Sequence, residues 1–473
     1  MSAPHADDGA PKRLIARAPA VGASQGAAER GVLTRAEAQA LVERTLRHST
    51  ADAARVSVQG GRETNLRFAD NQISTSGATT NTTVRVQSVF GKRRAAVVTN
   101  DRSDEGLRAA VRQSEALARL APEDPEAMPE LGAQQYVEVP AWFDATAALS
   151  AEDRARAAMS ALGPARAAKD LTVAGYLVCS AGAQAIGTSA GLFAYHRSTT
   201  ANYTLTARTT DGTGSGWAGA EHNDWRQVDV EAVARTAIEK ARRSRNPVAI
   251  EPGRYTVVFE PEAAANLVGL LGGALQARVA EEGRSAFAKP GGTRVGERIM
   301  DERVTLLSDP ADPLLLGAPF DGEGMPLARQ AWVQGGVLRQ LVYPRFWASK
   351  QGKPATGPAA SLRMTGGRES TASLVAGLRR GILVTRLWYL RPVDPRTLVY
   401  TGLTRDGTFL VEDGRIVRAI KNLRFNDSPL FMLNNVEAVG ETVRTAGGDG
   451  GPPLAMPALR VRDFNFTSLS DAV

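Results

Sequence analysis

The chain has 473 residues, of which 43% are hydrophobic and 23% charged, a composition typical of a folded globular protein. Its net charge of +7 is a small surplus over this length, so nucleic acid is not an expected partner. No apolar run approaches the roughly 18–20 residues that a membrane-spanning helix needs, so a membrane is not expected as a partner either.

Residues 1–33 are predicted to be a disordered leader. They are rich in Ala, Gly and Pro and weakly hydrophobic, a composition that cannot bury a core. They contain no apolar signal-peptide segment, and Asp7 and Asp8 stand where a signal peptide carries basic residues. We therefore expect a cytoplasmic protein.

Residues 34–245 are predicted to form an N-terminal domain with helices on an antiparallel or mixed sheet. Thr34 and Glu37 have the spacing of a capping box, which predicts a helix start. Apolar residues alternate with polar ones from Ala54 onward, which predicts strands. Later helices are each predicted to bury one face, and the last of them is predicted to end at Arg243. The expected inward face of the first of these consists of Leu107, Val111, Leu117 and Leu120.

Residues 246–473 are predicted to form a second, β-rich domain around a curved antiparallel sheet. An apolar strand at 255–260 precedes one prominent helix, predicted to run from about residue 261 to 281. Residues 412–415 (Glu-Asp-Gly-Arg) predict a tight hairpin turn. The fold class is therefore expected to be α+β with two domains, since the chain is too long for one ordinary core.

The four histidines do not form a recognisable metal site. A zinc site on a helix needs ligands about one turn apart, and no histidine has a second one at that distance. His5 lies in the leader, His48 is interpreted as a cationic residue at a helix end, and His196 lies within a strand. His222 is flanked by Glu221 and Asp224, and these three are interpreted as a solvated polar turn. The four histidines are His5, His48, His196 and His222.

Nucleophilic catalysis also lacks a recognisable motif. Cys179 is the only cysteine, which excludes an internal disulfide, and its apolar neighbours predict a buried, unreactive thiol. No G-x-S-x-G motif occurs, and residues 214–217 (Gly-Ser-Gly-Trp) lack the strand-to-helix setting of such a nucleophile. We therefore assign no catalytic and no metal-binding residue, and the sequence leaves the substrate-binding residues unassigned.

Long segments of the chain resemble the TldD/PmbA family, once called modulators of DNA gyrase. The first segment is 57–101, which begins SVQGGRETNLRF. The later ones are 319–352, which begins PFDGEGMPLARQ, and 379–440, which begins RRGILVTRLWYLRP. The resemblance extends from about Thr34 to the C-terminus.

The resemblance implies a two-subunit peptidase whose subunits share one fold and form a heterodimer. TldD-type subunits carry H-E-x-x-x-H on the first helix of the C-terminal domain and a cysteine near the C-terminus, which together bind zinc. PmbA-type (TldE) subunits lack these ligands. The pair resembles a processing protease that trims unfolded or extended peptides.

This chain departs from the TldD-type pattern at both parts of the zinc site. The corresponding helix begins PEAAANLVG, so alanines, Asn266, Leu267 and Gly269 stand where histidines are expected, although Glu262 is retained. Residues 444–464 contain no cysteine. The resemblance therefore implies a TldE-like subunit without zinc of its own, in a heterodimer or larger complex with a TldD-type zinc subunit. Such a subunit could complete the dimer interface, wall a tunnel, or offer a sheet edge to an extended peptide.

Two other functions stay open at this stage. The older gyrase-modulator name implies a non-enzymatic binding or regulatory protein, but a DNA-binding role predicts a dense basic face, which the sequence does not show. A stand-alone peptidase with atypical metal ligands is the other alternative.

Overall fold

The computed structural model describes residues 31–447 and 453–470. Helices and two large β-sheets make up this part of the chain, which confirms the α+β fold class. The predicted leader lies outside the described residues except for residues 31–33. None of the helices in the described part is both long and apolar enough to cross a bilayer.

The first sheet has six strands, and every neighbouring pair in it is antiparallel. Four of its strands are 17–19 residues long, well beyond the usual five or six. In spatial order the strands are β3 (Arg93–Thr99), β2 (Gln72–Phe90), β1 (Ala53–Ala69), β4 (Leu171–Thr188), β5 (Phe193–Thr209) and β6 (Ser215–His222).

Helices cover one face of this sheet. They are α1 (Arg35–Leu46), α2 (Asp104–Leu120), α3 (Asp144–Ala147), α4 (Ala151–Ala168) and α5 (Val230–Arg243), with a 3-10 turn at Trp225–Gln227. The predicted capping box is present, because the Thr34 hydroxyl accepts from the Glu37 amide at 3.2 Å and the Glu37 carboxylate accepts from the Thr34 amide at 2.8 Å.

The predicted inward face of α2 was partly wrong. Leu107 and Val111 are buried, but Leu117 and Leu120 are 45% and 82% exposed. The buried face continues instead through Ser114 and Ala118. Ser114 is a small residue, and its hydroxyl donates to the Ala95 carbonyl of β3 at 3.1 Å.

The second sheet has 13 strands and is mixed, which corrects the expectation of an antiparallel sheet. β14 runs parallel to β7, and β21 parallel to β13, while the other pairs are antiparallel. Its main path is β12 (Val337–Leu338), β11 (Gln330–Gln334), β10 (Leu306–Ser308), β13 (Arg363–Met364), β21 (Ala455–Leu469), β7 (Gly253–Phe259), β14 (Arg380–Val384), β17 (Thr408–Glu412) and β18 (Arg415–Ala419). The strands off this path are β15 (Leu387–Asp394), β16 (Val399–Thr404), β19 (Leu423–Asp427) and β20 (Val436–Arg444).

The helix expected at 261–281 is divided into three short helices, α6 (Pro261–Val268), α7 (Leu270–Ala274) and α8 (Ala277–Glu281). Glycine is a poor helix former, and Gly269, Gly272 and Gly273 lie within this stretch. Other short elements are α9 (Arg345–Gln351), α10 (Thr371–Ala376), α11 (Pro429–Asn434) and the hairpin of β8 (Ala288–Lys289) and β9 (Gly292–Thr293).

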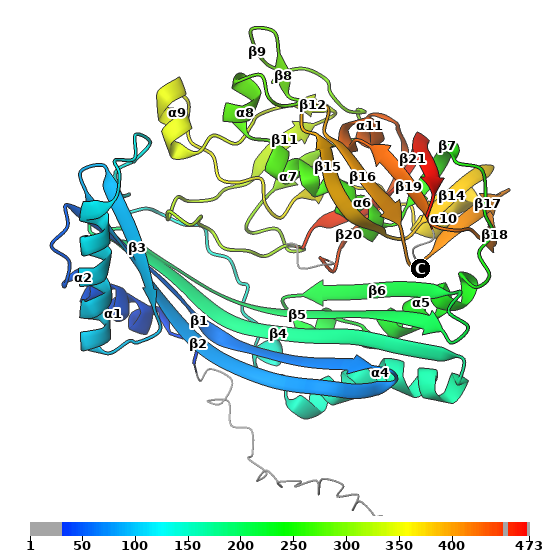
Figure 1. The fold of residues 1–473 in the computed structure, drawn as a ribbon, viewed down its shortest axis with the longest axis horizontal. Coiled ribbons are helices and arrows are strands. Elements are labelled where there is room, and N and C mark those ends of the chain that lie inside the picture. The colour runs from blue at the N-terminus through cyan, green and yellow to red at the C-terminus, as the bar shows by residue number, and fades with distance from the viewer. Residues whose placement is uncertain (1–30, 448–452, 471–473) are drawn as a thin grey trace, which may run out of the picture.

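The second half of the chain lies over the face of the first sheet that the helices leave open (Figure 1). Leu192 and Ala194 at the start of β5 pack there with Phe320. Tyr203, further along β5, points to the helix-covered face, where it packs with α4. The boundary near residues 245 and 246 stays a prediction.

Candidate functional site at helix α6

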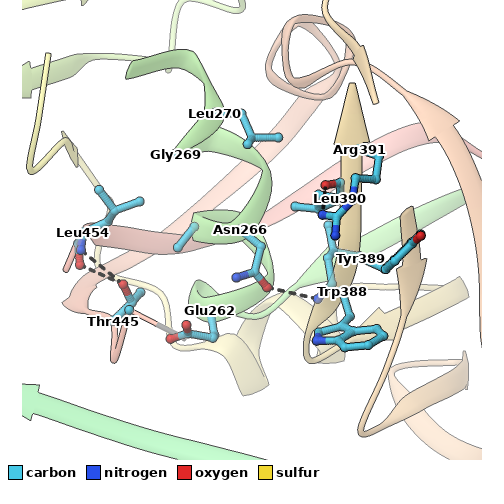
Figure 2. Close-up of a pocket in the computed structure, with 13 residues that line it drawn as sticks. Glu262, Asn266, Gly269, Leu270, Trp388, Tyr389, Leu390, Arg391, Thr445 and Leu454 are labelled. Carbon is cyan, nitrogen blue, oxygen red and sulfur yellow. Dashed lines mark hydrogen bonds between the residues drawn. The ribbon is translucent and has the colours of Figure 1, made fainter. Parts of the chain in front are cut away.

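A cavity of about 520 Å³ lies beside helix α6. Figure 2 shows α6 between β15 on one side and the segment containing Thr445 and Leu454 on the other. These three elements are far apart in the sequence, so only the tertiary fold brings them together.

Glu262 occupies the first turn of α6, directly after Pro261. Proline is well suited to the start of a helix, because it lacks the amide hydrogen that would otherwise have no partner there. The Glu262 Oε2 atom accepts a hydrogen bond from the Ala446 amide at 3.1 Å. This bond ties the start of α6 to the segment that follows β20.

Asn266 lies four residues after Glu262 and therefore on the same face of α6. Both residues line the cavity. The Asn266 Oδ1 atom accepts from the Leu387 amide at 3.1 Å, at the first residue of β15 (Figure 2). Two polar side chains of one helix face thus bind backbone amides of the two flanking segments.

The H-E-x-x-x-H pattern can be placed on this helix with its glutamate at Glu262. Pro261 and Asn266 then occupy the two histidine positions. The proline side chain has no donor atom for a metal, and the carbonyl oxygen of Asn266 already accepts a hydrogen bond. Among residues 31–447 and 453–470, no three His, Cys, Asp or Glu side chains are grouped so that they could hold a metal ion. This donor set does not fit zinc, which takes three or four nitrogen, sulfur or carboxylate ligands.

The β15 wall of the cavity contains an irregular segment. Pairing with β16 shifts register between Trp388 and Arg391, and Tyr389 between them has a φ of 57°. A left-handed conformation is uncommon for a bulky side chain, and such strain is concentrated at functional sites. The Arg391 guanidinium lies 4.5 Å from the Tyr389 ring centre, and the Tyr389 side chain is 49% exposed.

A second cavity, of about 480 Å³, continues along the same strand. It shares Gly269 and Leu270 with the first cavity and extends past Pro392 and Asp394 to Tyr400. In the described part of the chain, β15 pairs only with β16. We call the two cavities together the β15 groove, since they follow this strand for its eight residues, a length of about 26 Å.

The first sheet contacts the segment that follows β20 and holds it in place. The Asn202 side chain of β5 donates to the Ala446 carbonyl at 2.5 Å. Arg444 forms an ion pair of 2.9 Å with Glu221 of β6, and both side chains are less than 10% exposed. Arg444 also donates to the Asn223 side chain at 2.8 Å. The segment that binds Glu262 is therefore anchored by the N-terminal sheet.

The structure places none of the described histidines in the β15 groove. His48 follows α1 and lies 3.0 Å from Asp104. His196 is 6% exposed, and burial lowers its pKa to about 4. Burial, and then the charge of Arg444, also lower the pKa of His222. His5 lies outside the described residues.

The predicted solvated turn at Glu221, His222 and Asp224 was wrong. Asp224 is 4% exposed and forms an ion pair with Arg226 at 2.7 Å, while Glu221 faces Arg444. Asp224 is therefore paired with a neighbour in the sequence, whereas Glu221 is paired with an arginine of the second half of the chain.

The other predictions for single residues agree with the structure. Cys179 is buried, as predicted, and burial raises the pKa of its thiol to about 12. Ser215, Gly216 and Trp217 are the first residues of β6, where Trp217 is buried beneath Arg386, whose guanidinium lies 4.6 Å from the ring centre.

Sequence reasoning missed the β15 residues of the site. Trp388, Tyr389 and Arg391 belong to the run LWYLRP, in which an aromatic pair precedes an arginine and a proline. Adjacent aromatic residues in a strand point to opposite faces, so at least one is set away from a one-sided core. This pair of adjacent aromatic residues is the sequence pattern that could have predicted the β15 part of the site. Nothing local marks Thr445 and Ala446, whose role depends on distant contacts.

Comparison with known proteins identifies the family. The PmbA/TldA metallopeptidase domain 1 matches residues 54–118, the central domain matches 143–245, and the C-terminal domain matches 252–468. A metalloprotease of Methanothermobacter thermautotrophicus is 28% identical over 254 residues, which are 47% of this chain and 54% of that protein. A metalloprotease of Archaeoglobus fulgidus is 29% identical over 252 residues, 48% of this chain and 57% of that protein. The chain thus spans about half the length of the curated relatives it matches.

Two solved structures share the fold. TldE from Thermococcus kodakarensis has a TM-score of 0.81 at 19% identity, covering 91% of this chain and 99% of that one. A putative modulator of DNA gyrase from Thermotoga maritima has a TM-score of 0.78 at 17% identity, covering 88% and 96%. At these identities the likeness concerns the fold alone. The three domain matches cover most of the chain in family order, and we conclude that it belongs to the PmbA/TldD family of metallopeptidase-like proteins.

Proposed function

We propose that this chain is the non-catalytic, TldE-type subunit of a cytoplasmic two-subunit peptidase that processes unfolded or extended peptides. A TldD-type partner supplies the zinc ion in a heterodimer or larger complex. The observation that carries the proposal is the face of α6, where Glu262 and Asn266 bind backbone amides and Pro261 precedes them.

A hydrolytic zinc ion needs three protein ligands and one open position for water or substrate. On α6 a single carboxylate remains, and it is already hydrogen-bonded to the Ala446 amide. The helix therefore acts as a structural junction between β15 and the segment after β20. Peptide hydrolysis in such a complex requires ligands from another polypeptide.

The β15 groove supports a role in holding the substrate. A strand with one unpaired edge can bind an extended peptide through backbone hydrogen bonds, which depend little on the peptide's side chains. Asn266 occupies the Leu387 amide, so the edge open to a peptide begins after that residue. Trp388 and Tyr389 add aromatic surface, which contributes affinity without strict sequence requirements. The fold shared with the Thermococcus TldE supports the same assignment.

The test compares the purified chain alone with the chain mixed with a TldD-type subunit. An unfolded peptide is incubated with each, with and without a chelator, and the metal content of each sample is measured. We expect hydrolysis only in the mixture, its loss on chelation, and no stoichiometric metal in the lone chain. Chelator-sensitive cleavage by the lone chain would refute the proposal and favour an independent peptidase.

A further inference from the structure

Strand β2 exposes an unpaired edge over more than half its length. Its residues 84–90 pair with β3, whereas residues 72–83 pair with β1 on one side and with no strand of the described chain on the other. Figure 1 shows β2 at the outer edge of the first sheet. All residues from 72 to 81 are exposed except Gly77, which is half-buried, so both faces of the strand are open here.

Apart from a bulge at Ser74, where the register with β1 shifts, this edge lacks the features that usually prevent strands from pairing with other chains. Residues 72–83 read QISTSGATTNTT, with no charged residue and no proline, in a protein of which 23% is charged. Exposed edges are normally protected by charges, prolines or bulges. Two other edge strands of the molecule follow that rule: β3 carries Arg93 and Arg94, and β18 carries Arg415 and Arg418.

The composition of the edge suits pairing with itself. In an antiparallel pair around a two-fold axis, each residue of one strand faces a residue of the same segment in the other. Charged residues near such an axis would face like charges, which destabilise a sheet, whereas Thr and Ser pairs stabilise it. Gly31 lies against the Thr80 side chain and Ser74 is bulged, so the regular open run is 75–79, a length of about 16 Å. Ile73, 41% exposed, adds apolar surface at the hairpin end.

From the uncharged, two-sided edge we infer that residues 75–79 of β2 pair antiparallel with the same residues of a second copy of this chain. The pairing joins two six-stranded sheets into one continuous sheet across a two-fold axis. It uses a surface outside the α6 site and the β15 groove, so it does not depend on the proposed function.

The first test measures the mass of the full chain by light scattering at micromolar concentration. We expect twice the chain mass of 50.1 kDa, and a shift to the single-chain mass in both Thr75→Lys and Thr75→Glu, because each places like charges near the axis. Mixing the two variants should restore the double mass through opposite charges. Val417→Lys on β18, at a position 44% exposed, is the matched control and should leave the mass unchanged.

The second test introduces single cysteines at Thr75, Ser76, Gly77 and Ala78. Cys179 is the only native thiol, and it is buried, so it does not interfere. Disulfide formation between two chains should peak at one of these positions and fall at positions two residues away. Each step from the axis separates the two thiols by a further 6–7 Å, or about twice the rise per residue, and disulfides tolerate only short separations.

Three results would each overturn the inference. One is a single-chain mass for the unmodified protein, and another is a doubled mass that neither charge at Thr75 affects. The third is the absence of inter-chain disulfides at all four positions. Restoration on mixing shows that the charged variants are folded, so loss of the dimer in each alone reports on the edge.

Discussion

Replacing Arg444 by alanine tests whether the first sheet anchors the α6 site. The guanidinium forms an ion pair with Glu221 at 2.9 Å and donates to the Asn223 side chain and the Leu314 carbonyl at 2.8 and 2.9 Å. Both members of the ion pair are less than 10% exposed, so its removal leaves a buried carboxylate without its counter-charge. Such losses cost about 3–5 kcal/mol, a large part of the total stability of an ordinary domain.

The measurement is the free energy of unfolding from urea titration, together with hydrogen exchange at the Ala446 amide. We expect Arg444→Ala to destabilise by about 3–5 kcal/mol and to speed that exchange, because the segment that binds Glu262 loses its anchor. Arg380→Ala is the matched control. Its ion pair with Glu412 is exposed and 3.9 Å long, and should contribute less than about 1 kcal/mol.

A further variant separates the ion pair from its burial. Replacing Arg444 by Met and Glu221 by Leu together removes both charges, and apolar replacements of buried pairs are often close to neutral. The double variant should therefore be more stable than Arg444→Ala. The reasoning fails if Arg444→Ala costs no more than Arg380→Ala, or if the double variant is the less stable of the two.

Three other predictions concern helix α6, His196 and Tyr389. Pro261→His with Asn266→His restores H-E-x-x-x-H on α6 but not the cysteine, so we expect the double variant to bind zinc more tightly than the unmodified chain in a zinc titration; equal zinc affinity in both would contradict the proposed loss of ligands at these two positions. Burial lowers the pKa of His196 from about 6.5 to about 4, so the folded state holds this side chain neutral and is most stable above pH 6.5. About 3 kcal/mol of stability should be lost as the pH falls from 6.5 to 4. Urea titrations of His196→Gln should show a smaller loss over that range. Tyr389 has a φ of 57°, so Tyr389→Gly should melt higher than Tyr389→Ala, by about 1 kcal/mol in stability; equal melting temperatures would show that no strain is stored there.

Local chemistry made part of the fold predictable. The capping box at Thr34 and Glu37 and the turn at Asp413 and Gly414 depend on neighbours in the sequence, and the structure confirms both. The two turn residues have φ values of 47° and 74°, which glycine and aspartate tolerate well. The lack of a zinc site, predicted from the positions of the histidines and the single cysteine, stays a prediction.

Tertiary contacts decided what the sequence pattern left open. The apolar periodicity of 261–281 favoured one helix, but the segment breaks at Gly269 and again at Leu275 and Gln276, where the backbone binds Val342. Glu221 was predicted to lie in a solvated turn, but it forms a buried ion pair with Arg444, which is more than 200 positions away in the sequence. The α6 site depends on residues more than 100 positions apart, whose meeting is set by the packing of the two sheets. Periodicity reports only which face of an element is buried, and the packing partner is determined by the rest of the chain.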